Sequence, residues 1–174
     1  MNARRVYVIA ACIAIGVVAL TAPAVTPIPL RIIYNASESM PRGWYLAEPP
    51  AAPVVGRAVL LRLPAGAAAV AAQRGYLPAD VPLLKRVAAV APQSVCLTEG
   101  VLRIDGAPAG ALRLRDGRQR PLHAWMQCRR LRDDEVFVLG DARAVSYDSR
   151  YFGPLRACAL LANARPLWIW GQAP

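Results

Sequence analysis

An apolar run near the N-terminus constrains this chain more than any other feature. The run extends from Val6 to Val25 without a charged residue, and Arg4 and Arg5 precede it. A stretch of this length can cross the hydrocarbon core of a bilayer as a helix, and flanking arginines favour the cytoplasmic side. We therefore expect residues 1–26 to form an anchor in the inner (cytoplasmic) membrane. Residues 27–174 are expected to form one periplasmic domain, because their number suits a single core.

A cleaved secretory signal is the alternative for the same segment. Ala22-Pro23-Ala24 offers small residues of the kind that a signal-cleaving peptidase accepts. Pro23, however, would hinder the strand-like presentation that cleavage needs, and Pro27 and Pro29 suit an extended exit from the membrane. We favour a retained anchor. Both alternatives deliver the domain to an oxidising compartment.

The basic charge does not point to nucleic acid. The net charge is +10, with twenty arginines and one lysine. The arginines are scattered, and the sequence contains no aromatic-interleaved basic stripe, zinc-ligand spacing or helix-turn-helix pattern. We therefore expect no nucleic-acid partner and relate the charge to the anionic headgroups of inner membrane lipids or to solubility.

Three of the four cysteines belong to the predicted domain. Cys12 lies within the apolar run, where cysteine behaves as a small apolar residue. Cys96 and Cys128 flank a stretch with several turn signals, and in an oxidising compartment a disulfide between them is the natural interpretation. Cys158 is then expected to be a free, buried thiol. The sequence alone leaves other pairings of these three cysteines open.

The domain is expected to be mainly β with one or two short helices. An alanine-rich segment from Ala65 to Arg74 ends at Gly75, which predicts a short helix. A turn or short helix is expected over 153–163. Short apolar segments bounded by glycine, proline or acidic-glycine turns predict strands over 57–63, 83–90, 94–98, 101–104, 135–139 and 166–170.

The only lysine lies inside one of these predicted strands. A coding bias toward arginine explains why lysine is missing elsewhere, but not why Lys85 stands between Leu83 and Val90. A guanidinium stays charged in proteins, whereas burial can lower the pKa of a lysine from its usual value of about 10.4. Lys85 is therefore a candidate general base. The alternative is a lysine that extends to solvent from a strand edge.

A serine nucleophile would need such a base. The only histidine, His123, lies in a hairpin region with no acidic residue nearby in sequence. A Ser-Lys dyad is therefore favoured over a Ser-His-Asp triad. Two further segments contain polar residues that turns do not explain, namely Ser37-Glu38-Ser39-Met40-Pro41 and residues 140–150, which begin with Gly140-Asp141.

Taken in order, these motifs resemble the type I signal peptidases. The similarity comprises Ser39-Met40-Pro41, Lys85-Arg86, and Gly140-Asp141 leading to Ser146-Tyr147-Asp148-Ser149-Arg150. The variant Ser-Met-Pro-Arg-Gly-Trp-Tyr, the small size and Arg74-Gly75-Tyr76-Leu77-Pro78 are more similar to the TraF-type conjugal-transfer peptidases. The resemblance spans nearly the whole chain, and it implies a signal-peptidase-like coiled β-sheet fold.

The resemblance also implies a role for each motif residue. Ser39 would be the nucleophile, and Lys85 the general base that returns the proton to the leaving amine. The Ser37 hydroxyl and the backbone N–H of Ser39 would form the oxyanion hole. Ser146 would orient the lysine amine, and Asp148 and Arg150 would form a buried supporting ion pair. From the residues alone, Ser37 with Asn35, and likewise Ser146, also fit turn elements.

The implied reaction is amide hydrolysis through an acyl-enzyme, without metal or cofactor. The implied substrate is a membrane-associated preprotein bound extended along a strand edge. The most specific function that the resemblance implies is maturation of the pilin subunit of a conjugative transfer (type IV secretion) system, with contacts to the transfer apparatus. One alternative is a housekeeping signal peptidase, which Ala142 in place of asparagine and the lack of an inserted β domain disfavour. An inactive bitopic scaffold is the other alternative, which the presence of both Ser39 and Lys85 disfavours.

Overall fold

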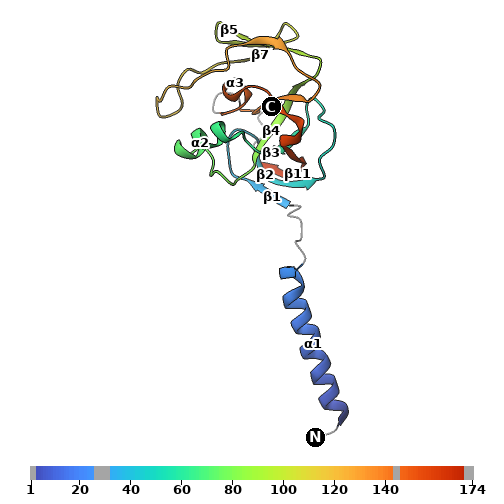
Figure 1. The fold of residues 1–174 in the computed structure, drawn as a ribbon. Coiled ribbons are helices and arrows are strands. Elements are labelled where there is room, and N and C mark those ends of the chain that lie inside the picture. Colours follow the sequence, from blue (N-terminus) through green and yellow to red (C-terminus); the bar gives the residue numbers. More distant parts are fainter. Residues whose placement is uncertain (1–2, 26–31, 143–145, 171–174) are drawn as a thin grey trace. The chain divides into compact units, whose positions relative to one another are not determined.

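A computed structural model describes residues 3–25, 32–142 and 146–170 of the chain (Figure 1). The chain divides into two units, Met1–Leu30 and Arg31–Pro174. The first contains one helix, α1 (Ala3–Val25). In the described part of the chain, no helix combines the length and the apolar character that crossing a membrane requires. The anchor over residues 1–26 stays a prediction, and its boundary with residue 27 lies outside the described residues.

The second unit is mainly β, as predicted, and its larger sheet has seven strands in the order β1-β2-β11-β3-β4-β9-β10. All neighbouring strands of this sheet are antiparallel. Their bounds are β1 (Ile32–Asn35), β2 (Arg42–Glu48), β11 (Leu160–Trp170), β3 (Ala58–Leu61), β4 (Leu83–Val90), β9 (Glu135–Leu139) and β10 (Leu155–Arg156). β4 lies inside the sheet, between β3 and β9, so its backbone is paired on both sides.

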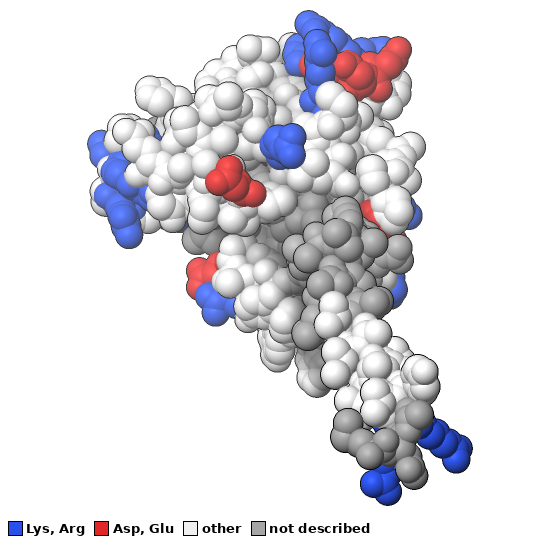
Figure 2. Space-filling model, turned by 60° about the horizontal axis from the view of Figure 1, so that its bottom comes forward, with Lys and Arg blue, Asp and Glu red and all other residues white. Residues whose placement is uncertain are grey.

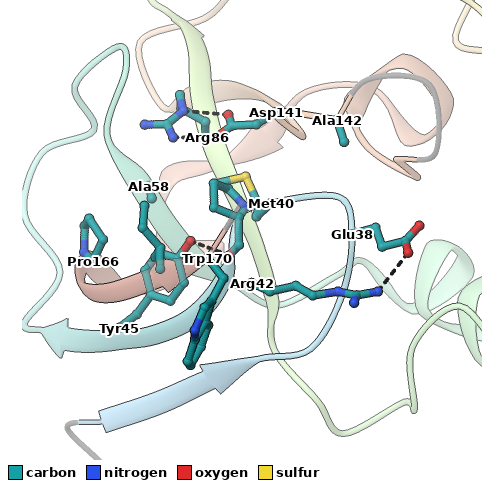
Figure 3. A pocket seen from close by; sticks show the side chains of 12 residues that line it. Glu38, Met40, Arg42, Tyr45, Ala58, Arg86, Asp141, Ala142, Pro166 and Trp170 are labelled. Atoms are coloured by element: carbon teal, nitrogen blue, oxygen red, sulfur yellow. Dashed lines mark hydrogen bonds and ion pairs between the residues drawn. The ribbon is translucent and has the colours of Figure 1, made fainter. Parts of the chain in front are cut away.

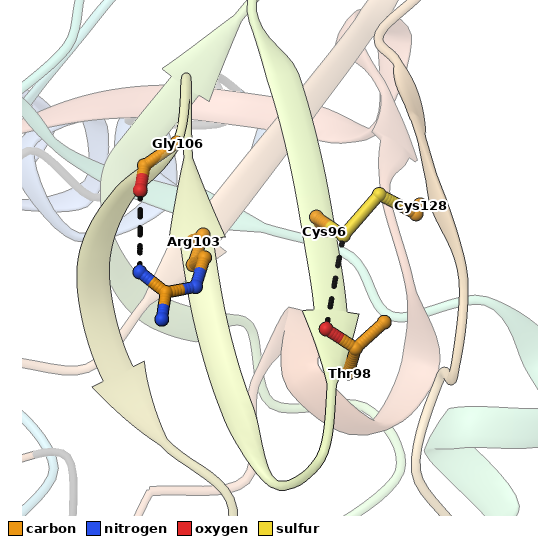
Figure 4. The surroundings of a disulfide bond; sticks show 5 residues. All are labelled: Cys96, Thr98, Arg103, Gly106 and Cys128. Atoms are coloured by element: carbon orange, nitrogen blue, oxygen red, sulfur yellow. Dashed lines mark hydrogen bonds between the residues drawn. A yellow bond between two sulfur atoms is a disulfide. The ribbon is translucent and has the colours of Figure 1, made fainter.

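The smaller sheet has four strands in the order β7-β6-β5-β8. These are β7 (Ala107–Ala111), β6 (Val101–Ile104), β5 (Ser94–Thr98) and β8 (Cys128–Arg130). Cys96 of β5 and Cys128 of β8, the pair expected from the sequence, are joined by a disulfide between directly opposed residues (Figure 4). Cys158 is free as expected, but the prediction that it is buried is wrong. It is exposed, because it lies in a surface 3₁₀ helix, η2 (Ala157–Ala159).

Three groups of buried side chains hold the domain together. Val59, Val87 and Val138 belong to a cluster within the large sheet. Phe137 of β9 packs with Val95 of β5 and other residues of the small sheet, so the two sheets share a core. The third cluster contains Met40, Tyr45, Ala58, Leu60, Leu84 and Ala164. It connects the turn after β1 to the start of β4, where the predicted catalytic residues lie.

The helix and several strands form where the sequence predicts them. β4, β5, β6 and β9 have the predicted bounds, and α2 (Ala65–Gln73) is followed by Gly75, whose φ of +70° is the left-handed conformation that glycine adopts readily. The region 153–163 differs, since it contains β10, η2 and the start of β11. The closing strand is longer than the predicted 166–170, because β11 pairs with both β2 and β3 and continues through an irregularity between Pro166 and Trp168. A short helix, α3 (Ser149–Phe152), lies just before this region.

Removing the disulfide should destabilise the domain. Replacing both Cys96 and Cys128 by alanine releases a loop with a sequence separation of 32 residues. We expect the free energy of unfolding to fall by about 2–4 kcal/mol, as for other disulfides that close loops of this size. Urea titration of the oxidised domain measures this. Cys158→Ser is the matched control and should leave the midpoint unchanged, and a loss below about 0.5 kcal/mol for the double variant would contradict the prediction.

Candidate active site

Ser39 lies in a tight turn between β1 and β2, and the Asn35 side chain organises that turn. The Asn35 amide nitrogen donates to the carbonyl oxygens of Ser37, Met40 and Pro41 at 3.2, 3.1 and 3.0 Å. Its amide oxygen accepts from the backbone N–H and the hydroxyl of Ser37, at 3.1 and 2.8 Å. These contacts fix the amide orientation, because only the nitrogen can donate. Asn35 therefore holds the backbone on both sides of Ser39.

The far end of the same turn is held from the core. The Met40 side chain is 1% exposed. The Tyr45 hydroxyl donates to the Pro41 carbonyl at 2.7 Å. Burial is the largest cause of a raised pKa for Tyr45, so this phenol keeps the proton that it donates. Ser39 is thus presented between a buried methionine and an asparagine-bridged turn, on rigid backbone.

Lys85 reaches Ser39 from the interior of the sheet. It lies on β4 opposite Val59 of β3, and its side chain is buried. Its Nζ donates to Ser39 Oγ at 2.6 Å. Burial, the largest effect, lowers the pKa of Lys85 to about 8, against the attraction of Asp148 and Asp141 and with the help of Arg150. Removal of the amine from water thus outweighs the nearby carboxylates, and the amine can lose its proton near neutral pH.

The Ser37 hydroxyl lies beside the Ser39 hydroxyl. Its oxygen lies 3.2 Å from Ser39 Oγ. Because the Asn35 amide oxygen can only accept, the Ser37 hydroxyl is the donor in the 2.8 Å hydrogen bond between them. The Ser39 hydroxyl must then donate to Ser37 while it accepts from Lys85. This arrangement fits a protonated Lys85, and it places Ser37 beside Ser39 as the resemblance implies.

Gly140 brings a second segment against the Ser39 turn. A Cβ at Gly140 would lie 2.3 Å from Ser146 Oγ and 2.7 Å from the Ser39 carbonyl oxygen. The Ala142 N–H donates to that same carbonyl at 3.2 Å. Only a residue without a side chain allows this approach, so Gly140 is a structural requirement of the site.

Ser146 follows directly after residues that the structure leaves undescribed, 143–145. Its hydroxyl oxygen is buried and forms no hydrogen bond with any described residue. Lys85 Nζ bonds to Ser39 instead. The role of Ser146 in orienting the lysine amine stays a prediction, but its hydroxyl lies in the packed region beside Gly140.

Asp148 and Arg150 form a fully buried ion pair, with side-chain exposures of 0% and 1%. Arg150 Nε donates to Asp148 at 2.8 Å, and the carboxylate also accepts from the Gly140 N–H at 3.1 Å. Arg150 further donates to the carbonyls of Ala111 and Ser146, at 2.6 and 3.3 Å. The pair therefore ties Gly140 and Ser146 to β7 of the small sheet.

A cleft of about 710 Å³ adjoins the turn that carries Ser39 (Figure 3). Met40, Tyr45 and Ala58 supply apolar lining, while Glu38 with Arg42 and Arg86 with Asp141 form ion pairs among the lining residues. Glu38 and Met40 flank Ser39 in sequence, and Arg86 follows Lys85. The residues that adjoin Ser39 and Lys85 in sequence thus line this cleft, but Ser39 and Lys85 themselves do not.

No group of three or more histidine, cysteine, aspartate or glutamate residues in the described ranges could hold a metal ion. His123 is exposed and lies in the loop between β7 and β8. Asp141 and Asp148 are both engaged by arginines. The described residues at the site therefore offer acid–base and hydrogen-bonding groups.

Sequence reasoning offered a turn element for Ser37 with Asn35, and the structure shows that Asn35 organises such a turn. It named Gly140 and Tyr45 only as members of motifs and missed their structural roles. The spacing Asn35-x-Ser37 is a local signal for an asparagine side chain that bonds backbone two residues on. Gly140 and Tyr45 offer no such signal, because their roles arise only when distant segments pack against the Ser39 turn.

Comparison with known proteins identifies the class. The sequence model of the family described as "Signal peptidase, peptidase S26" matches residues 4–170. The chain therefore belongs to the signal peptidase family S26, a family of peptidases. Its similarity to curated relatives places it among the TraF-type members of that family.

Three of these relatives illustrate the similarity. "Plasmid transfer protein TraF" of Escherichia coli is 31% identical over 147 residues, covering 78% of this chain and 82% of that protein. "Conjugal transfer protein TraF" of Agrobacterium tumefaciens (strain 15955) is 36% identical over 186 residues, covering 98% and 99%. "Probable conjugal transfer protein TraF" of Sinorhizobium fredii is 38% identical over 141 residues, covering 75% and 73%.

Among solved structures, a signal peptidase I from Enterococcus faecalis V583 shows a remote likeness. It is 17% identical, covers 65% of this chain and 97% of that chain, and gives a TM-score of 0.41.

The single lysine allows its pKa to be measured directly. Protein grown with ¹³C,¹⁵N-lysine should give one lysine side-chain signal, and its titration should show a pKa of about 8 in the folded state. Because the folded pKa lies below the unfolded value, the unfolded chain binds more protons between about pH 8 and 10.5, so this group makes stability rise with pH across that window. The urea-unfolded protein is the control and should titrate near 10.4. A folded-state value near 10.5 would contradict burial of the amine.

Gly140→Ala should disturb the site without any change in charge. The new Cβ would overlap Ser146 Oγ and the Ser39 carbonyl, so we expect a loss of about 1–3 kcal/mol in the free energy of unfolding. The Lys85 NMR signal should shift as well. Gly66→Ala in α2 is the matched control, since nothing lies within 4 Å of its Cβ, and it should be neutral or slightly stabilising. Equal stability of the two variants would show that the Gly140 contact is not tight.

Proposed function

We propose that this protein is a membrane-anchored serine endopeptidase that cleaves a membrane-associated preprotein with a Ser39–Lys85 dyad. The observation that carries the proposal is the 2.6 Å contact between the Lys85 amine and Ser39 Oγ, together with a lysine pKa of about 8. Family membership supports the peptidase activity. The names of the relatives refer to plasmid and conjugal transfer, which supports a role in a conjugative system. The substrate that we propose is the pilin subunit of that system.

The proposed reaction begins with a neutral Lys85. With a pKa of about 8, about one molecule in ten carries the neutral amine at pH 7. That amine takes the Ser39 proton as Oγ attacks the scissile carbonyl carbon. The resulting lysine ammonium then gives this proton to the leaving amine nitrogen, and an ester to Ser39 remains. A water molecule, deprotonated in turn by Lys85, hydrolyses the ester and restores Ser39.

The developing oxyanion needs donors, and two are close to Ser39 Oγ. One is the backbone N–H of Ser39 itself, on the turn that Asn35 holds. The other is the Ser37 hydroxyl, 3.2 Å from Ser39 Oγ. In the structure Ser37 donates to Asn35, so it must rotate toward the substrate oxygen to serve. A donor of this kind typically contributes about 2.7–4 kcal/mol to lowering the barrier.

The edge of the large sheet supports binding of an extended substrate. β1 is an outer strand of that sheet and ends at Asn35, two residues before Ser37. A preprotein segment could pair with the free edge of β1 and run past Ser39, as peptides do when they extend a sheet. The adjoining cleft, with Met40 and Tyr45 in its lining, would then receive side chains near the cut.

Two features support a location in the inner membrane with a cytoplasmic N-terminus and a periplasmic domain. Residues 6–25 are uncharged and follow Arg4 and Arg5. The domain also has exposed aromatic rings in mutual contact: Tyr34 lies 5.1 Å from Trp44 and 6.1 Å from Trp170, which in turn lies 6.2 Å from Trp168. Aromatic side chains of this kind favour the headgroup level of a bilayer.

The arginines do not form a nucleic-acid surface on the face seen in Figure 2. There the basic side chains lie in separate groups, some beside acidic ones, and leave no continuous basic track.

A cleavage assay on a co-expressed candidate prepilin tests the proposed dyad. Ser39→Ala removes the nucleophile, and Lys85→Arg replaces a base that can be neutral with a permanent cation. We expect each variant to lose activity by about 10³-fold or more while remaining membrane-inserted. Processing is measured by the mass of the product.

The control is Ser94→Ala on β5, in the small sheet, which should process at the wild-type rate. Processing by Lys85→Arg at the rate of the control would remove the dyad from consideration. Cleavage of ordinary secretory precursors in preference to the prepilin would instead indicate a housekeeping signal peptidase. A wild-type protein that cleaves neither would indicate an inactive scaffold.

A further inference from the structure

The helix that carries Arg150 is too short to be stable alone. α3 spans Ser149–Phe152, and isolated helices shorter than about 12–15 residues are marginal in water. At its start, the Asp148 side chain accepts from the Arg150 N–H. Ser149 Oγ also accepts from the Val138 N–H of β9 at 3.0 Å. The start of the helix is thus held, and the position of Arg150 depends further on what holds its end.

Trp125 holds the end of α3. Its backbone N–H donates to the Arg150 carbonyl at 2.9 Å. Its ring lies against Gly153, the residue that ends the helix, since a Cβ at Gly153 would lie 2.7 Å from Trp125 Cδ1 and 2.9 Å from Nε1. Gly153 also has a φ of +79°, which favours glycine. Trp125 therefore contacts the helix through both its backbone and its side chain.

The Trp125 ring has firm contacts of its own. It packs on Phe137 of β9, with the ring centres 5.7 Å apart, and the Arg129 guanidinium lies 5.7 Å from the centre of the ring. Arg129 is held in turn by both oxygens of the Glu135 carboxylate, at 2.6 and 2.9 Å. The ring is therefore fixed to β9, the strand that also contacts the start of α3.

The disulfide fastens the segment that follows Trp125. Cys128 is joined to Cys96 of β5 (Figure 4). Next to it, the Leu97 N–H donates to the Gln127 carbonyl at 2.8 Å, two residues after Trp125. The small sheet therefore gives Trp125 a fixed position from which to hold α3.

We propose that Trp125 is a positioning residue that holds α3 so that Arg150 stays paired with Asp148. Through that pair, Trp125 fixes the balance of charge that acts on the Lys85 amine. The proposal rests on the proposed function of Ser39 and Lys85, and it extends that function by giving the small sheet a part in preparing the base. Trp125 acts through Arg150.

The Lys85 amine is sensitive to the position of Arg150. Burial is the largest cause of its lowered pKa, and the charged groups that act on it in the described part of the chain are Asp148, Arg150 and Asp141. The two carboxylates raise the pKa and Arg150 lowers it. Displacement of Arg150 would leave the Asp148 carboxylate unopposed, and water that entered the gap would also favour the charged amine. Both effects raise the pKa of Lys85.

The experiment titrates the single lysine by NMR in Trp125→Ala and Trp125→Phe. We expect Trp125→Ala to raise the pKa of Lys85 by about one unit, and Trp125→Phe, which keeps a ring beside Gly153, to leave it close to the wild-type value. On the candidate prepilin, a rise of about one unit lowers the processing rate at pH 7 about tenfold, and the rate recovers at higher pH. A loss of stability alone would not recover in this way.

Leu131→Ala is the control for lost packing. Leu131 is buried in the same cluster that the Trp125 ring packs against, and its backbone N–H bonds to Gln93. We expect this variant to lose stability while the pKa of Lys85 stays unchanged. An unchanged Lys85 pKa in folded Trp125→Ala would overturn the proposal, and so would an equal rise in Leu131→Ala. Should Trp125→Ala not fold, Trp125→Leu carries the same test with more of the packing retained.

The titration needs no substrate. Failure of the wild-type protein to cleave the prepilin would therefore count against the proposed function, whereas the role of Trp125 is decided by the Lys85 pKa in the variants.

Discussion

Removal of the Lys85 amine from water is the constraint on which the rest of the site depends. The residue lies on β4, inside a seven-stranded sheet, with β3 and β9 on either side. Its pKa of about 8 follows chiefly from that burial. Asp148 would raise the pKa and Arg150 would lower it, but they form a tight pair, so their effects on the amine largely oppose each other. The fold can therefore keep a carboxylate near the lysine without restoring its ordinary basicity.

The site is the meeting of two backbone segments, each rigid for its own reason. Asn35 fixes the Ser39 turn with bonds to three carbonyl groups, and the Asp148–Arg150 pair fixes the segment that begins at Gly140. A buried ion pair contributes little net stability, because the cost of desolvating two charges offsets their attraction. Its value lies in its geometry, since Arg150 also bonds to Ala111 of the small sheet. The pair thus joins the second sheet to the back of the active site.

Sequence patterns predicted those parts of the structure that depend on local signals. The strands over 83–90 and 135–139 were predicted at their observed bounds because short apolar runs lie between turn residues. The length of β11 was missed because pairing with β2 and β3 overrides the local turn signals before residue 166. Ser39 and Lys85 were named from motifs, and Asn35 had a local turn signal, yet the positions of Gly140 and Tyr45 against the Ser39 turn required the packing of distant segments. Exposure of Cys158 was missed for the same reason.

The direction of the hydrogen bonds at Ser39 connects the resting site to the proposed reaction. A protonated Lys85 donates a hydrogen bond to Ser39 Oγ. The Ser39 hydroxyl must then donate a hydrogen bond to Ser37 Oγ, and the Ser37 hydroxyl donates one to the Asn35 amide oxygen. When the amine loses its proton it can accept from Ser39, so the Ser39 hydroxyl turns from Ser37 toward Lys85. Ser37 Oγ then no longer accepts a hydrogen bond from Ser39. The Ser37 hydroxyl can rotate away from Asn35 and donate to a substrate oxyanion, and a hydrogen bond to this charged acceptor is stronger than the one to the Asn35 amide oxygen. In the proposed mechanism, a single deprotonation thus prepares both the nucleophile and the oxyanion donor.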